Sequence, residues 1–170
     1  RLPLRSLKGY EFPDELGIRC NHHDAWVNGA NDPLSGQVAM MEESRSICEL
    51  VKTGLKPKRT IVYCSWYGEE PGLMGSTEWV EEHEKEVQDK AVCYINSDDN
   101  GRGFLCVEGS HALEPLMDEI AKQVIDPQTN VSVFERRKAG RAITASSTEA
   151  KKKILDEKDL KLDAMGSGSD

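Results

Sequence analysis

The fold is decided by residues 59–72, which read Arg59-Thr60-Ile61-Val62-Tyr63-Cys64-Ser65-Trp66-Tyr67-Gly68-Glu69-Glu70-Pro71-Gly72. Ile61-Val62-Tyr63-Cys64 is a continuous apolar run, which predicts a strand from Arg59 to Trp66 that is covered on both faces. The residues after it contain glycine and proline, which predicts a tight loop from Tyr67 to Gly72. A helix is predicted from there to about Lys85. This order of strand, loop and helix is typical of an α/β domain.

Further elements are predicted on the N-terminal side of this unit. A strand is expected from Glu15 to Cys20, entered through the turn signal Phe12-Pro13-Asp14, and a polar loop follows from Asn21 to Ser35. A helix is then expected from about Gly36 to Thr53, with Gly54 after its last residue. The apolar face of this helix is predicted to consist of Val38, Met41, Cys48 and Val51.

On the C-terminal side the pattern of strand and helix continues. A buried strand is predicted from Ala91 to Asn96, and another strand from Gly103 to Val107. Apolar residues at three- and four-residue spacing between Leu113 and Val124 predict a helix that packs against the sheet. The charge runs at residues 135–138 and 151–153 are interpreted as solvated surface.

Length and composition set the protein class. The chain has 170 residues, which corresponds to about one domain of about 100–200 residues. Its net charge of −8 disfavours a nucleic-acid surface, and it contains no apolar stretch near the roughly 18 residues of a membrane helix. The five cysteines are odd in number and form no CxxC pair, which predicts mostly buried free thiols. The chain reads as an excerpt of a longer protein.

Acidic residues and a histidine follow each of three predicted strands. His22, Asp24 and Asp32 come after the first strand, Glu69 and Glu70 after the second, and Asp98 and Asp99 after the third. Open α/β sheets place their sites outside the carboxyl ends of the strands. The sequence therefore brings nitrogen and oxygen ligands to one edge of the sheet, and such a set suits zinc or another divalent metal.

Taken singly, each of these groups has an ordinary structural explanation. A histidine beside an aspartate is commonly a capping or surface pair, and two glutamates before a helix complement its dipole. Asp98-Asp99-Asn100-Gly101 is by itself a good turn. Their joint placement after three strands favours metal binding over three separate structural roles.

Several long motifs, in order, resemble the glutamate carboxypeptidase and transferrin receptor family of zinc exopeptidases. Residues 21–26 (Asn-His-His-Asp-Ala-Trp) and 31–36 (Asn-Asp-Pro-Leu-Ser-Gly) resemble its first metal-binding loop. Residues 65–79, which include Gly68-Glu69-Glu70-Pro71-Gly72, resemble the catalytic loop and the helix after it. Residues 94–98 (Tyr-Ile-Asn-Ser-Asp) resemble the third metal strand, and 166–170 (Gly-Ser-Gly-Ser-Asp) a substrate-pocket loop.

The resemblance implies a set of metal ligands. His22 and Asp98 would bind the first of two zinc ions, Asp32 would bridge both ions, and Glu70 would bind the second. Asp24 would hold the His22 imidazole in the required tautomer. If Asp32 turns its carboxylate between two ions, the chain must also reverse at once into the helix at Gly36. A cis Asp32–Pro33 bond would allow this, and about 5–6% of such bonds are cis in folded proteins. The family's remaining ligand to the second metal, a histidine, would lie beyond residue 170.

The resemblance implies that Glu69 is the catalytic residue, which would take a proton from the metal-bound water and pass it to the leaving amine. Amide hydrolysis at neutral pH needs such a base within reach of a water whose pKa a metal has lowered to about 7. Leu73, Gly168 and Ser169 would contact the substrate. The resemblance also places a calcium site at Glu78 and Glu81, but the favoured interpretation of these two residues in this chain is a solvated acidic helix face.

The resemblance also implies an architecture and a setting. The expected fold is the three-layer zinc-exopeptidase fold, α/β, with a mixed, mainly parallel sheet flanked by helices and its C-terminal part missing. Residues 1–170 would form a partial catalytic domain that lacks the protease-associated domain and the helical domain, and a homodimer would require the latter. The family suggests a secreted, periplasmic or membrane-anchored ectodomain.

The predicted function is metal-dependent hydrolysis of terminal peptide bonds in a peptide substrate, of the carboxypeptidase or aminopeptidase type. A catalytically inactive receptor-like or scaffold member of the same fold is the alternative, as is an inactive fragment. Loss of ligands would indicate an inactive member, yet the five residues of the predicted centre are all present: His22, Asp32, Glu69, Glu70 and Asp98.

Overall fold

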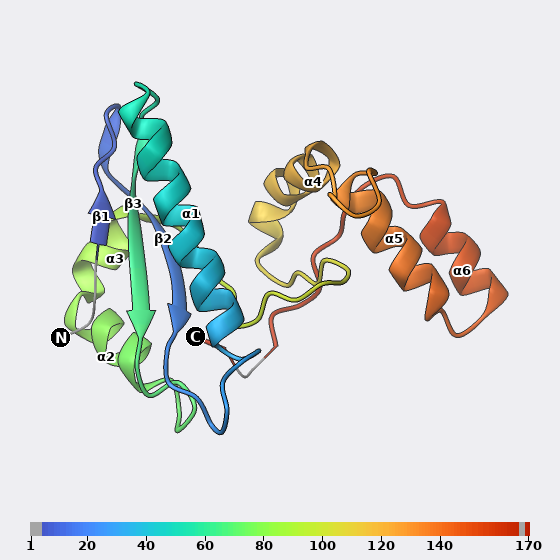
Figure 1. The fold of residues 1–170 in the computed structure, drawn as a ribbon, viewed down its shortest axis with the longest axis horizontal. Coiled ribbons are helices and arrows are strands. Elements are labelled where there is room, and N and C mark those ends of the chain that lie inside the picture. Colours follow the sequence, from blue (N-terminus) through green and yellow to red (C-terminus); the bar gives the residue numbers. More distant parts are fainter. Residues whose placement is uncertain (1–4, 167–168) are drawn as a thin grey trace. The chain divides into compact units, whose positions relative to one another are not determined.

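The protein is described here by a computed structural model that covers residues 5–166 and 169–170. The chain forms two compact units, Arg1–Gly101 with Gly168–Asp170, and Arg102–Ser167. Figure 1 shows the elements of each unit in the order of the chain. The first unit contains the sheet, and the second is helical.

The sheet of the first unit is mixed and mainly parallel, as predicted. Its strands are β1 (Arg5–Leu7), β2 (Phe12–His22), β3 (Arg59–Trp66) and β4 (Ala91–Asn96), in the order β1-β3-β2-β4. β1 is antiparallel to β3, whereas β2 is parallel to both β3 and β4. His22 lies opposite Trp66, and Cys20 lies opposite Asn96. The three parallel strands therefore end at the same edge of the sheet.

Helices cover both faces of this sheet (Figure 1). They are α1 (Leu34–Lys52), α2 (Met74–Glu82) and α3 (Glu84–Lys90). Glu43 of α1 contacts Arg19 and Tyr63, whereas Trp79 of α2 packs with the side chain of Cys20. Because successive residues of a strand point to opposite faces, α1 lies on one side and α2 on the other. The predicted three-layer arrangement is confirmed.

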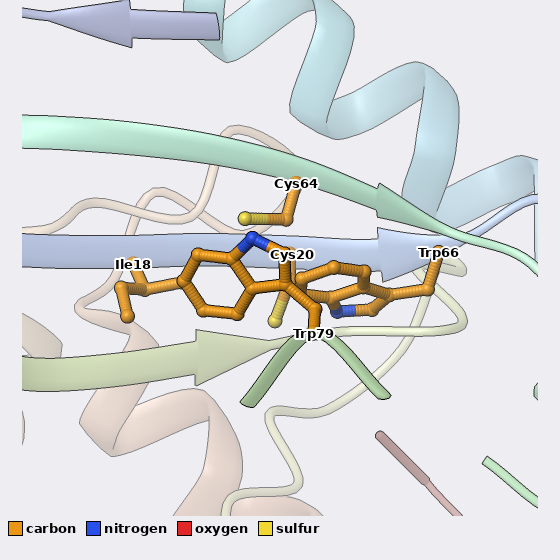
Figure 2. Close-up of a cluster of buried hydrophobic side chains, with 5 residues drawn as sticks. All are labelled: Ile18, Cys20, Cys64, Trp66 and Trp79. Carbon is orange, nitrogen blue, oxygen red and sulfur yellow. The ribbon is translucent and has the colours of Figure 1, made fainter. Parts of the chain in front are cut away.

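The core between the sheet and α2 is aromatic and sulfur-rich (Figure 2). Its buried members are Ile18, Cys20, Cys64, Trp66 and Trp79. The rings of Trp66 and Trp79 have centroids 5.4 Å apart at an interplanar angle of 46°, a tilted packing that aromatic pairs favour. Burial raises the pKa of the Cys20 and Cys64 thiols to about 12, so both remain neutral packing groups.

The second unit has its own small core. Its helices are η1 (His111–Leu113), α4 (Glu114–Gln123), α5 (Val133–Ile143) and α6 (Thr148–Leu155). Ala121 of α4 and Phe134 of α5 pack with Leu160 and Leu162, which follow α6. In the described part of the chain, no helix combines the length and the apolarity that crossing a membrane requires.

Two predictions for the first half of the chain are wrong in detail. The strand expected at Glu15–Cys20 covers Phe12–His22. Residues 12–14, which we predicted to form a turn, belong to this strand, and its pairing with β3 shifts register between Phe12 and Leu16, where Pro13 lies. The predicted apolar face of α1 is exposed at Val38, Met41 and Cys48, while Gly36 and Met40 are buried. The side of the helix that carries Gly36, Met40 and Glu43 faces the sheet, since Glu43 accepts hydrogen bonds from Arg19 and Tyr63.

The helix and strand after β3 also differ from the prediction. The helix expected to run to Lys85 ends at Glu82, and α3 starts at Glu84 after a break at His83. β4 has the predicted bounds, but it is not buried. Its residues are exposed or half-buried because the strand lies at the edge of this sheet.

Further predictions fail beyond residue 100. Residues 103–107 form no strand, and the nearby pairing is a single bridge between Glu108 and Asp163. The apolar residues of α4, predicted to pack against the sheet, belong to the separate core of the second unit. Arg137, which we predicted to lie on a solvated surface, is buried and donates to Lys161 O and Asp163 Oδ2. Of the five cysteines only Cys20 and Cys64 are buried, although all are free.

Candidate metal centre

The centre is assembled from the three loops that leave β2, β3 and β4. β2 ends in His22, the β3 exit leads to Glu69 and Glu70, and the β4 exit leads to Asp98. A close contact draws the first and third exits together, since the Gly36 N–H donates to Asp98 O at 3.2 Å. A Cβ at Gly36 would lie 2.1 Å from Ser97 O, so only glycine permits this approach.

His22 is the best-defined donor of the centre. Its side chain is 1% exposed, and its Nδ1 lies 2.9 Å from Asp24 O. Because a carbonyl oxygen only accepts, Nδ1 carries the proton, and Nε2 is the nitrogen that faces the acidic groups. Asp32 Oδ1 is 3.0 Å from Nε2. The tautomer that metal ligation by Nε2 requires is therefore set by a backbone group.

Carboxylates surround Nε2 of His22. Glu69 Oε2 lies 3.8 Å away and Asp98 Oδ1 3.9 Å away, in addition to Asp32. Burial by itself lowers the pKa of His22, but the charges of Asp98, Glu69 and Asp32 outweigh it and raise the pKa. Burial raises the pKa of Glu69, whose side chain is 10% exposed. The site concentrates negative charge around one imidazole, an arrangement that a cation stabilises.

Three of these residues meet the geometric requirement of a metal site. Ligand atoms of His22, Glu69 and Asp98 all lie within 4.8 Å of one another. Asp32 touches the imidazole but its side chain is 58% exposed, so it lies at the open side of the group. One imidazole nitrogen and several carboxylate oxygens form a donor set that fits zinc.

The Asp24 carboxylate has a structural role that the sequence did not indicate. It lies 3.5 Å from His22 Nδ1, but its hydrogen bonds come from the backbone N–H groups of Glu69 (3.2 Å) and Glu70 (3.3 Å). Burial alone raises the pKa of Asp24, but these N–H groups outweigh it and lower the pKa. Asp24 thus ties the loop after β2 to the loop after β3, and its predicted role toward the His22 tautomer stays a prediction.

Glu70 is not brought into the group of ligand atoms. Its Oε1 accepts the backbone N–H of Trp26 at 2.6 Å, on the loop after β2. Glu69 and Glu70 therefore point to different partners, as expected of neighbours at an irregular strand exit. Asp99 also lies apart from His22 and accepts from Asn31 Nδ2 at 3.0 Å. The role of Glu70 as a ligand to a second metal stays a prediction.

Of the residues predicted to contact the substrate, Leu73 and Ser169 are described by the structure, and their role stays a prediction. Leu73 precedes α2 with a φ of 55°, a left-handed conformation that is uncommon for a non-glycine residue. Ser169 Oγ accepts from Asn96 Nδ2 at 2.5 Å. Gly168 lies outside the described residues. The contact of Asn96 was missed, although its position two residues before Asp98 places both side chains on the same side of the chain.

Two further predictions concern the surroundings of the centre. The Asp32–Pro33 bond is cis, as predicted. Glu78 and Glu81 are exposed on α2, and Glu78 Oε2 accepts from the Tyr67 hydroxyl at 2.6 Å. Nothing in the described part of the chain adds a third calcium ligand to them.

The fold and the donor set define an α/β protein with a candidate metal centre at the carboxyl edge of a mainly parallel sheet. Residues 7–146 match the family model described as peptidase family M28. The chain belongs to this family of peptidases. A probable glutamate carboxypeptidase of Zea mays is 44% identical over 122 residues, covering 71% of this chain and 17% of the relative.

Other relatives carry both carboxypeptidase and aminopeptidase names. A glutamate carboxypeptidase 2 homolog of Caenorhabditis briggsae is 39% identical and an aminopeptidase of Mus musculus 35% identical, each over 79% of this chain and 20% of its own length. The crystal structure of a peptidase M28 precursor from Shewanella amazonensis superposes with a TM-score of 0.52 at 26% identity, covering 68% of this chain and 26% of that one. The chain thus spans about a fifth of the curated relatives it matches.

Proposed function

We propose that this chain is the metal-binding part of a zinc-dependent exopeptidase domain that hydrolyses terminal peptide bonds. The observation that carries the proposal is the convergence of ligand atoms from His22, Glu69 and Asp98 within 4.8 Å, from three different loops. Membership of a peptidase family supports a hydrolytic use of this centre. Relatives named as carboxypeptidases and as an aminopeptidase leave the substrate terminus open.

The residues of the chain fall into distinct roles in this proposal. His22, Asp32 and Asp98 would hold the first metal, and Asp32 and Glu70 would contribute to a second one. Zinc bound there supplies Lewis acidity, which lowers the pKa of a coordinated water to about 7 and polarises a carbonyl group. Glu69 does not serve as a permanent ligand and instead accepts a proton from water, then gives it to the departing amine.

The protein environment prepares Glu69 for this role. Its side chain is largely shielded from solvent, and its backbone N–H is held by the Asp24 carboxylate at 3.2 Å. Leu73, four residues after Glu69 and directly before α2, has a left-handed backbone, and its N–H donates to Glu69 O at 2.8 Å. Backbone outliers of this kind cluster at functional sites. These contacts fix the loop, so the carboxylate is positioned before a substrate binds.

Substitution of the two glutamates tests the proposal. Glu69→Gln keeps the size of the side chain but cannot accept the proton, so in a longer chain that carries the family's C-terminal histidine turnover should fall by about 10²–10⁴-fold while zinc remains bound. Glu70→Gln should weaken the second zinc ion, and added zinc should restore part of its activity. Zinc content by mass spectrometry and hydrolysis of blocked and unblocked peptides are the measurements.

Stoichiometry provides a second test that needs no activity. Residues 1–170 should bind one zinc ion, because only the first metal finds three protein ligands among them: His22, Asp32 and Asp98. Two tightly bound ions per chain would contradict the assignment of ligands. Peptide hydrolysis that persists after complete removal of metal would contradict the mechanism.

A further inference from the structure

Asn96, the last residue of β4, makes two contacts that no role assigned so far uses. Its Nδ2 lies 2.8 Å from Asp98 Oδ1 and 2.5 Å from Ser169 Oγ. A carboxylate only accepts hydrogen bonds, so the group that faces Asp98 is the amide NH₂ and not the amide oxygen. Each of the two amide hydrogens therefore has a partner, one at the metal centre and one on the C-terminal segment.

The contact with Asp98 acts on a candidate metal ligand. A hydrogen bond to one carboxylate oxygen restricts rotation of the carboxylate. Asp98 is mostly shielded, with a side chain 15% exposed, and its Oδ1 lies 3.9 Å from His22 Nε2. Hydrogen-bond partners that orient ligating carboxylates commonly contribute about 10–100-fold to metal affinity.

The contact with Ser169 links the same amide to the C-terminal segment. That segment has a second attachment one residue later, where the Ser76 hydroxyl donates to Asp170 Oδ1 at 2.5 Å. Ser76 belongs to α2, the helix that follows the loop of Glu69. Residues 169 and 170 are therefore tied both to the strand that leads to Asp98 and to the helix behind the proposed base.

We propose that Asn96 is a positioning residue that holds Asp98 for the first metal and, through Ser169, holds residues 169–170 beside that candidate metal centre. This inference rests on the proposed function. Asn96 thus supports both Asp98, a proposed metal ligand, and Ser169, a predicted substrate contact. Metal binding at Asp98 and the position of Ser169 are therefore coupled through one side chain.

A purely structural role for Asn96 is a weaker explanation of these contacts. β4 is an edge strand, and Asn96 belongs to neither of the buried apolar clusters. Its amide oxygen is buried without a hydrogen-bond partner in the described part of the chain, which costs stability. The amide orientation serves the two donor contacts and leaves the oxygen unpaired, which favours a role for the donor hydrogens over a role in stability alone.

The test measures zinc affinity on residues 1–170 by competition with a chromophoric chelator, beside urea denaturation of the metal-free chain. Asn96→Ala should weaken zinc binding by about 10–100-fold and leave the metal-free stability unchanged. Asn96→Gln retains the donor and should recover part of the affinity. Asn100→Ala is the matched control, because Asn100 is exposed and its amide only approaches Ser97 Oγ at 3.4 Å; it should bind zinc as the wild type does.

A second readout separates the two contacts. In a longer active chain saturated with zinc, Asn96→Ala and Ser169→Ala should both raise KM while kcat changes little, and Ser169→Ala should leave zinc affinity unaltered. Failure of the wild-type chain to bind zinc would overturn the proposed function and this inference together. Zinc binding by the wild type with equal affinity in Asn96→Ala, or a loss of metal-free stability in that variant, would overturn this inference alone.

Discussion

Replacing Gly36 by alanine puts the assembly of the metal centre to a quantitative test. Within a helix this substitution usually stabilises a protein by about 0.5–1 kcal/mol, because alanine restricts the unfolded chain more than glycine does. At Gly36 the added Cβ would instead lie 2.1 Å from Ser97 O, 2.2 Å from Asn21 Nδ2 and 2.5 Å from Asp98 O. Two of these atoms are backbone oxygens, so no side-chain rotation relieves the contact.

The expected cost follows from these distances. Ordinary carbon contacts begin near 3.5 Å, so the start of α1 and the Asp98 segment must separate by roughly 1 Å. Overpacking costs about 1–3 kcal/mol, and backbone neighbours place Gly36→Ala at the upper end. After the gain in helix propensity the net destabilisation is about 2 kcal/mol. With an m-value of about 2 kcal/mol/M, the urea midpoint should fall by about 1 M.

Tryptophan fluorescence is the suitable assay, because the three tryptophans of the chain all belong to the sheet-containing unit. Zinc affinity should fall in parallel, since the shift displaces Asp98 from His22. Gly101→Ala is the control, because a Cβ there meets no atom within 4 Å. A Gly36→Ala variant that unfolds at the same urea concentration as the wild type, or at a higher one, would refute this reasoning.

Two more expectations concern stability. Trp79→Ala should destabilise the first unit by about 3–5 kcal/mol, because the ring is buried against Trp66. Val80 is exposed, so the control Val80→Ala should change stability by about 0.5 kcal/mol or less. Equal urea midpoints for the two variants would contradict the assigned core. Burial by itself raises the pKa of Asp126, but its hydrogen bonds with Arg136 and the adjacent turn outweigh burial and lower the pKa from 3.8 to about 2. Ionised Asp126 therefore stabilises the fold above about pH 4, and this contribution is lost as the pH falls toward 2. Asp126→Asn should therefore be less stable than the wild type at pH 7 and equally stable near pH 2 by circular dichroism, and a gap that widens on acidification would contradict the sign.

Local pattern was enough to predict the framework of the first unit. The continuous apolar run predicted β3 with its observed bounds, and the bounds of β4 are also as predicted. The placement of His22, the Glu69–Glu70 pair and Asp98 after three parallel strands follows from the same pattern, because parallel strands end at a common edge. Residue type and period, which are properties of the sequence itself, determine these features.

The second unit was predicted less well for a related reason. Residues 103–107 have the composition of a strand but find no strand to pair with, since the nearby backbone pairing is one bridge to Asp163. Arg137 lies in a charged run that is typical of a surface, yet its guanidinium is buried through contacts with a segment 24–26 residues away. Pairing and burial depend on distant partners that a local window does not contain.

Only the tertiary structure decided how the side chains of the centre are used. The sequence contains two adjacent glutamates, but the fold turns Glu69 toward His22 and Glu70 toward the backbone of Trp26. It also decided that Asp24 holds the Glu69 loop through backbone N–H groups and that Asn96 reaches Ser169, 73 residues away along the chain. Sequence specifies which chemical groups are available at each strand exit, whereas the close approach of separate loops determines which of those groups meet, because hydrogen bonds extend only about 3 Å.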